Sequence, residues 1–160
     1  MWSGRTQQRE PSRTVALDNG RAEDGRPLID ARLRWAFRTL ITLHAVAVFA
    51  QSILAGAFLD GHYAMLALHR QNAIGLILLG YVQILVAIAY WRAGGGPSWP
   101  LWASVALSVA ETVQFFLGLG RLIGLHVPLG VTIIVCTILL AQWAWGDRFG
   151  RLRQPALGTA

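Results

Sequence analysis

Two of the histidines that stand within the long apolar stretches of this 160-residue chain, where a polar side chain is costly, are the first candidates for chemistry. They are His69 and His126. A neutral imidazole offers one ring nitrogen to a metal ion, and two imidazoles on opposite sides of a helical bundle can hold a haem iron between them. The alternative role for the pair is a structural hydrogen bond between helices, worth about 0.6 kcal/mol on average in membranes.

Three more polar residues fall at a similar depth in the apolar stretches: Gln51, Glu111 and Gln114. At a rise of about 1.5 Å per residue, they form with the two histidines a layer roughly 8–14 Å below one end of the stretches. The layer predicts a polar relay beside the histidine pair. For Glu111, the alternative to a proton relay is an ion pair with Arg70 or Arg121, which we expect near the same end. His44 lies about 24 Å from that end and is expected to be structural.

Four apolar stretches must position these residues, and each has the roughly 20 residues needed to cross a ~30 Å hydrocarbon core as a helix. They run over 36–58, 63–91, 99–118 and 122–145. Because the breaks between them are short, consecutive helices should be antiparallel neighbours. The fold predicted is an all-α membrane protein, a four-transmembrane-helix up-down bundle over 34–146. Polar tails are expected at 1–33, which has the composition of a disordered segment, and at 147–160.

Composition agrees with a membrane protein: 54% of residues are hydrophobic, 14% are charged and the mean hydropathy is +0.46. Soluble domains carry about 25% charged residues. The net charge of +6 raises the possibility of nucleic-acid binding. However, the arginines that flank the apolar stretches gather at one end of the predicted bundle. They are Arg32, Arg34, Arg38, Arg92, Arg148, Arg151 and Arg153.

The clustered arginines predict an orientation, because positive residues mark the cytoplasmic side. Both termini are therefore expected in the cytoplasm, with the protein in a bacterial plasma membrane. Six tryptophans fall at the same end: Trp35, Trp91, Trp99, Trp102, Trp143 and Trp145. The lipid bilayer is the expected partner, and no nucleic acid is. The single cysteine, Cys136, excludes a disulfide framework, a CxxC redox pair and a thiolate zinc site.

A short internal repeat relates the two halves of the chain. Leu66-Ala67-Leu68-His69 matches Ile123-Gly124-Leu125-His126, and Ala50-Gln51-Ser52 loosely matches Ala110-Glu111-Thr112. The repeat predicts two helical hairpins related by an approximate twofold axis along the membrane normal. Such an axis would bring the two histidines to opposite sides of the bundle at equal depth. Seven-residue spacing also places His62, His69 and Gln83 on one stripe, and His44 and Gln51 on another.

The motifs Leu68-His69-Arg70 and Leu125-His126 resemble one four-helix half of the haem A synthase family, over about residues 36–145. In that family each half binds haem through histidines on its second and fourth helices, which implies His69 and His126 as iron ligands here. The chain has four of the family's eight helices. It also lacks the acidic residue before the first histidine and the cysteine pair of an outer loop. The resemblance therefore implies haem binding rather than haem oxidation.

The leading hypothesis is a b-type cytochrome-like or haem-handling protein, with haem b held by His69 and His126 and with no catalytic residues. Arg70 and Arg121 are expected near the haem propionates. Its partners would be respiratory-chain membrane proteins or a second copy of the chain. The alternatives are a non-enzymatic subunit or assembly factor of a larger membrane complex, and a small proton-coupled transporter that uses Glu111.

Overall fold

The structure, a computed structural model, describes residues 26–146 and is entirely helical over that range. It contains α2 (Arg26–Leu59), α3 (Ala64–Arg92), α4 (Trp99–Leu119) and α5 (Ile123–Trp145). Each helix is long and apolar enough to cross a membrane, so the chain is an integral membrane protein with the predicted four-helix fold. The tail predicted at 147–160 lies outside the described residues. So does most of the tail predicted at 1–33, although α2 already begins at Arg26.

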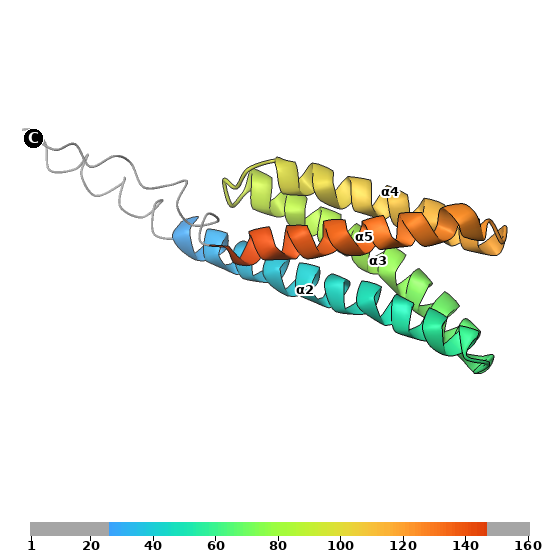
Figure 1. Cartoon of the computed structure of the whole chain (residues 1–160). Helices are drawn as coiled ribbons and strands as arrows, with labels where there is room; N and C mark the ends of the chain where they lie inside the picture. Colours follow the sequence, from blue (N-terminus) through green and yellow to red (C-terminus); the bar gives the residue numbers. More distant parts are fainter. Residues whose placement is uncertain (1–25, 147–160) are drawn as a thin grey trace, which may run out of the picture.

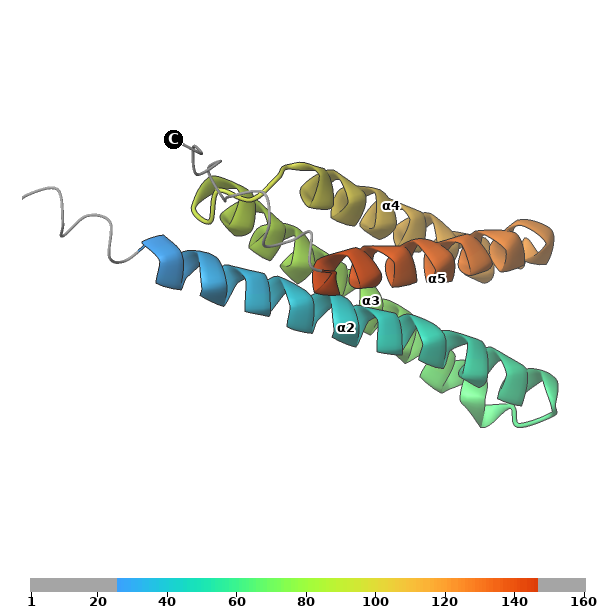
Figure 2. The same cartoon turned by 60° about the vertical axis from the view of Figure 1, so that its left-hand side comes forward.

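The four helices run up and down around a square (Figure 1). Each helix packs against two neighbours, in the order α2, α3, α4, α5 and back to α2, while the diagonal pairs α2–α4 and α3–α5 do not pack on each other. The turns α2–α3 and α4–α5 lie at one end of the bundle, the turn end, and the two hairpins stand apart there (Figure 2). The start of α2, the α3–α4 connection and the end of α5 lie at the opposite end, the terminal end.

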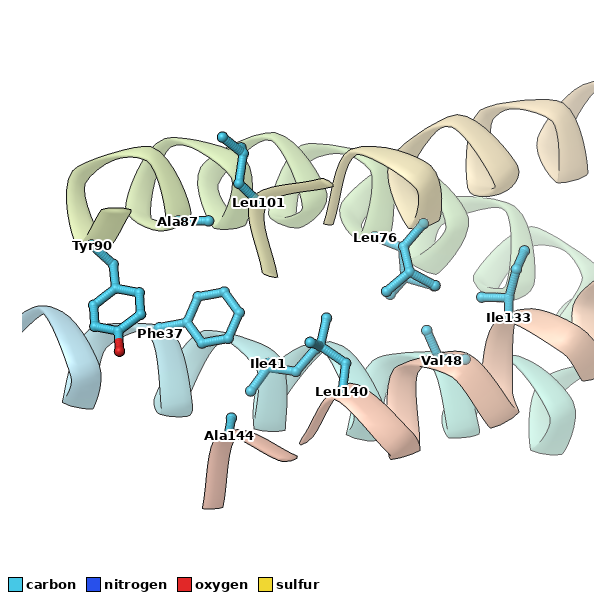
Figure 3. Close-up of a cluster of buried hydrophobic side chains, with 11 residues drawn as sticks. Phe37, Ile41, Val48, Leu76, Ala87, Tyr90, Leu101, Ile133, Leu140 and Ala144 are labelled. Carbon is cyan, nitrogen blue, oxygen red and sulfur yellow. The ribbon is translucent and has the colours of Figure 1, made fainter. Parts of the chain in front are cut away.

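Core positions recur at spacings of three and four residues along every helix. In α3 the buried residues are Leu76, Gly80, Gln83, Ala87 and Tyr90. This spacing keeps one stripe of each helix on the bundle axis, as in coiled-coil packing. Apolar side chains from all four helices meet along that axis (Figure 3). Outward positions such as Val46 and Phe49 remain exposed although they are apolar, as expected for helices in contact with lipid.

Arginine and tryptophan side chains join α2 to α5 at the terminal end. The guanidinium of Arg38 lies 5.4 Å from the ring centre of Trp35 and 5.2 Å from that of Trp145. Its Nε donates to the Ala144 carbonyl (2.8 Å), and Trp145 Nε1 donates to Thr42 Oγ1 (3.0 Å). Cation–π contact with amphipathic rings is typical of the membrane interface. Of the six tryptophans predicted to lie at this end, Trp35 and Trp145 therefore also help to hold α2 against α5.

The α4–α5 turn contains a strained residue at the turn end. Arg121 has φ of +55°, in the left-handed region that non-glycine residues rarely adopt. Its N–H donates to the Gly118 carbonyl (3.1 Å), and the N–H of Leu122 donates to the Leu117 carbonyl (3.0 Å). These two bonds satisfy carbonyls in the last turn of α4. Glycine is the usual residue at such a position. Here it is an arginine.

Replacing this arginine should therefore stabilise the fold. We expect Arg121→Gly to raise the free energy of unfolding by about 1 kcal/mol, because glycine adopts the left-handed conformation without a steric penalty. Arg70→Gly, in the regular part of α3, is the matched control and should lower it by about 1 kcal/mol. Unfolding in detergent, followed by circular dichroism, measures both changes. A loss of stability in Arg121→Gly would contradict the assignment of strain to this turn.

Candidate functional site

The histidine pair predicted from the sequence is brought together in the structure. His69 extends from α3 and His126 from α5, across the diagonal of the square, and both side chains are partly buried. Their ring centroids lie 6.3 Å apart, with the ring planes inclined at 59°. Because the two helices do not pack on each other, only these long polar side chains connect them at this level. The pair thus bridges the two hairpins near the turn end.

The same kind of hydrogen bond orients both rings. His69 Nδ1 donates to the Gln51 main-chain carbonyl (3.2 Å), and His126 Nδ1 donates to the Gln114 main-chain carbonyl (3.0 Å). A carbonyl oxygen can only accept, so each Nδ1 carries the ring proton and each Nε2 carries a lone pair. Neither Nε2 has a hydrogen-bond partner within residues 26–146. Metal-binding histidines are commonly fixed by such a bond at the other nitrogen.

Gln51 and Gln114 hold equivalent positions in the two hairpins. Each lies on the first helix of its hairpin, and its main-chain carbonyl accepts a hydrogen bond from the histidine of the second helix. Gln114 also donates from Nε2 to the His126 carbonyl (2.7 Å). The side-chain oxygens of both glutamines are buried without a partner among the described residues. The repeat is therefore present in the structure, but Gln114, rather than Glu111, is the counterpart of Gln51.

A glycine makes room for one of the two rings. A Cβ atom at Gly118 would lie 3.0 Å from His126 Cε1 and 3.2 Å from its Nδ1, which is closer than side chains normally approach. A Cβ at Gly124, in the first turn of α5, would meet nothing within 4 Å. The absence of a side chain at Gly118 thus allows the His126 ring to lie against α4.

Arg70 and Arg121 do not make the ion pair expected for Glu111. Both arginines are exposed near the turn end. Glu111, which is only 6% exposed, instead pairs through Oε1 with Nε2 of the fully buried His44. The interpretation of Glu111 as a member of the histidine layer is therefore wrong: its partner lies deeper in the bundle.

The His44–Glu111 pair belongs to a chain of hydrogen bonds across α2, α3 and α4, the central polar cluster. His44 Nδ1 donates to Gln83 Oε1 (3.0 Å), and Gln83 Nε2 donates to Ser104 Oγ (2.9 Å). The Ser104 hydroxyl donates in turn to the Pro100 carbonyl (2.8 Å). His44, Gln83 and Ser104 are each at most 1% exposed. Every donor in this chain has one acceptor.

The hydrogen-bond chain fixes the number of protons on the pair. Gln83 Oε1 can only accept, so His44 Nδ1 must carry a proton. Between His44 Nε2 and Glu111 Oε1, contact requires one further proton, because two lone pairs would repel. That proton belongs either to an imidazolium facing a carboxylate or to a carboxylic acid facing a neutral imidazole. In both forms the pair is neutral overall, as burial in an apolar core favours.

Counting depth from helix ends misplaced His44. Glu111 stands eight residues before Leu119, where α4 ends, but His44 stands fifteen residues before Leu59, where α2 ends. The α2–α3 hairpin therefore extends about 10 Å further beyond the pair than the α4–α5 hairpin does. The stripe spacing was the better signal: His44 lies seven residues from Gln51, and Gln83 lies fourteen from His69, on the faces that meet at the bundle axis.

The donor set restricts which metal centre the histidine pair could form. Within residues 26–146 no group of three or more histidine, cysteine, aspartate or glutamate side chains is placed to hold a metal ion. A protein zinc site uses three or four such ligands. Two opposed imidazoles match the two axial positions of a haem iron, whose other four ligands come from the macrocycle.

The partner of Glu111 can be tested by energetic coupling. In a double-mutant cycle with His44→Leu and Glu111→Leu, we expect the coupling to unfolding to be about 1–2 kcal/mol, because either single change leaves a buried polar group without its partner. The matched cycle with Arg70→Leu and Glu111→Leu should be additive within about 0.5 kcal/mol. Unfolding in detergent gives both values. Equal coupling in the two cycles would argue against the assignment.

Comparisons with known proteins add no relative to this picture. No protein-family model, curated protein or solved structure matches the chain.

Proposed function

We propose that this protein binds haem b within the membrane, with His69 and His126 as the two axial ligands near the turn end of the bundle. One observation carries the proposal. Two imidazoles from different hairpins lie with their ring centroids 6.3 Å apart, both oriented by main-chain carbonyls and both with Nε2 available. A structural hydrogen bond between the rings would need Nε2 of one ring to carry a proton, and in both rings the proton is on Nδ1.

The spacing of the rings fits a single ion between them. Metal–imidazole bonds of about 2 Å, with each nitrogen about 1.1 Å from its ring centre, put the two centroids about 6 Å apart. The observed separation is 6.3 Å. When bound, haem would supply one-electron redox chemistry.

The remaining residues of the site would hold and orient the group. The main-chain carbonyls of Gln51 and Gln114 keep each ring in the tautomer that can ligate. Arg70 follows His69 directly, and Arg121 lies five residues before His126, so both offer guanidinium groups to propionates near the interface. The unpartnered side-chain oxygens of the two glutamines can accept hydrogen bonds from water or from a protonated propionate.

The proposed protein is a b-type cytochrome-like or haem-handling protein rather than an enzyme. His69 and His126 would both bind the iron of a haem held here, so the iron would have no position left for a substrate. Electron-transfer partners would be respiratory-chain membrane proteins or a second copy of the chain. A haem-free subunit or assembly factor remains the competing function, and it predicts co-purification with a membrane complex and tolerance of changes at His69.

Absorption spectra test haem binding. Protein purified in detergent after expression with added haem precursor should show the reduced-minus-oxidised bands of six-coordinate haem b. His69→Ala and His126→Ala should each lose them, because each removes one axial ligand. His62→Ala is the matched control: His62 is exposed in the α2–α3 turn and bonds the Ala57 carbonyl, so its removal should leave the bands unchanged. A featureless wild-type spectrum, or bands that persist in both ligand variants, would end the proposal.

The glycine beside His126 gives a second test of the same ligand. Gly118→Ala should shift or weaken the haem bands, because the added Cβ would press on the ring. Gly124→Ala, where a Cβ meets nothing, should leave them as in wild type. Equal spectra in the two variants would show that the position of the His126 ring does not matter for binding.

We further propose that the turn end faces outward and the terminal end the cytoplasm. The support is the clustering of arginine and tryptophan at the terminal end. In a Cys136→Ser background, Asp60→Cys in the α2–α3 turn should react with a membrane-impermeant maleimide in intact cells. Ala93→Cys, in the α3–α4 connection, should react only after the cells are opened. The opposite labelling pattern would reverse the orientation.

A further inference from the structure

Two buried oxygen atoms, one in the central polar cluster and one beside it on α4, have no partner among the described residues. They are Glu111 Oε2 and Ser108 Oγ, on side chains that are 6% and 4% exposed. Both border the same point of α3: a Cβ atom at Gly80 would lie 2.5 Å from Ser108 Oγ and 3.3 Å from Glu111 Oε2. Because Gly80 has no side chain, α4 packs closely on α3 at this point and brings two unpartnered oxygens together.

We propose that Glu111 is a proton-binding site in the centre of the bundle, which exchanges protons with water admitted beside Gly80 and Ser108. The inference goes beyond haem binding and does not depend on it. A cluster that served only to join helices would be expected to satisfy its buried oxygens, as the His44–Gln83–Ser104 part does. A carboxyl oxygen and a hydroxyl left open at one point supply two partners for a water molecule.

The proton transfer balances without any other reactant. The resting pair is neutral, with one proton on His44 Nδ1 and one between Nε2 and Glu111 Oε1. A proton delivered by water forms an O–H bond at Glu111 Oε2, and the shared proton then belongs to His44 Nε2. The product is a carboxylic acid beside an imidazolium, with a net charge of +1. Return of the proton from Oε2 to water restores the resting pair.

Apart from this pair, the ionisable side chain buried in the core within residues 26–146 is that of Tyr90, which stacks on Phe37. From α3 the pair meets Gln83 and Gly80, neither of which titrates. α5 contributes to the core the buried Thr137, whose hydroxyl donates to the Ile133 carbonyl. Cys136, the nearest ionisable residue in that sequence, is exposed. On α2, Arg38 is engaged at the terminal end with Ala144 and two tryptophans.

Infrared spectroscopy of the full-length protein in liposomes tests the inference. Spectra across a pH titration should contain a carboxylic C=O band that grows as the pH falls and shifts in D2O. We expect Glu111→Gln to lose this band, whether or not the preparation holds haem. If Glu111→Gln does not fold, isotope labelling assigns the band instead. The double variant Glu10→Gln/Glu23→Gln, grown with ¹³C-glutamate, has Glu111 as its only labelled glutamate, so a shift of the band identifies Glu111.

The route to the carboxyl is tested by the rate at which the band exchanges in D2O. Gly80→Ala and Ser108→Ala should both slow the exchange, the first because the added Cβ would displace the Ser108 hydroxyl and the second because it removes that hydroxyl. Gly75→Ala, on the same helix with nothing within 4 Å of the new Cβ, should exchange at the wild-type rate. The inference is overturned if the Glu111 band does not respond to pH while the protein stays folded. It is equally overturned if Gly80→Ala and Ser108→Ala exchange as fast as Gly75→Ala.

Discussion

The hydrocarbon core of a bilayer contains no water, so a polar group inside it is costly unless it finds a partner within the protein. This constraint explains where the polar side chains of the bundle lie. The helix backbones satisfy most of their own groups, and the second lone pairs of main-chain carbonyls accept the remaining donors. Asn72 donates to the Ala47 carbonyl (2.8 Å), and His69 and His126 do the same at Gln51 and Gln114. These polar residues therefore link neighbouring helices, whatever further role they have.

The same constraint gives the two polar levels of the bundle different properties. Near the turn end the hairpins stand apart, and the histidines cross a diagonal on which no helices pack. Each of these rings keeps one nitrogen without a partner. In the centre α2, α3 and α4 are close enough for four side chains to satisfy one another almost completely. The histidine level has ring nitrogens without a hydrogen-bond partner, which favours binding of an added group. The central level has nearly all of its hydrogen bonds, which favours binding of nothing larger than a proton.

The sequence was sufficient to predict the helices, because long apolar stretches with short glycine-containing breaks allow few alternatives in a membrane. It also predicted that His69 and His126 would meet. It did not predict the partner of Glu111. Depth was counted from the helix ends, but the unequal reach of the two hairpins beyond the core is a property of their packing, and no local pattern encodes it. The seven-residue stripes that contain His44 and Gln83 were visible, yet a stripe specifies a face of a helix and not a height relative to another helix.

The four histidines of the chain thus differ in which ring nitrogens already have a hydrogen-bond partner. His62 is exposed in a turn and bonds only a carbonyl, so water can satisfy the rest of its ring. His44 has partners at both nitrogens, which excludes it as a metal ligand in this arrangement but allows it to share a proton with Glu111. His69 and His126 each have one nitrogen fixed and one open, 6.3 Å apart between ring centres. In the two proposals, the number of ring nitrogens already engaged separates the proposed ligands, His69 and His126, from the proposed proton carrier, His44.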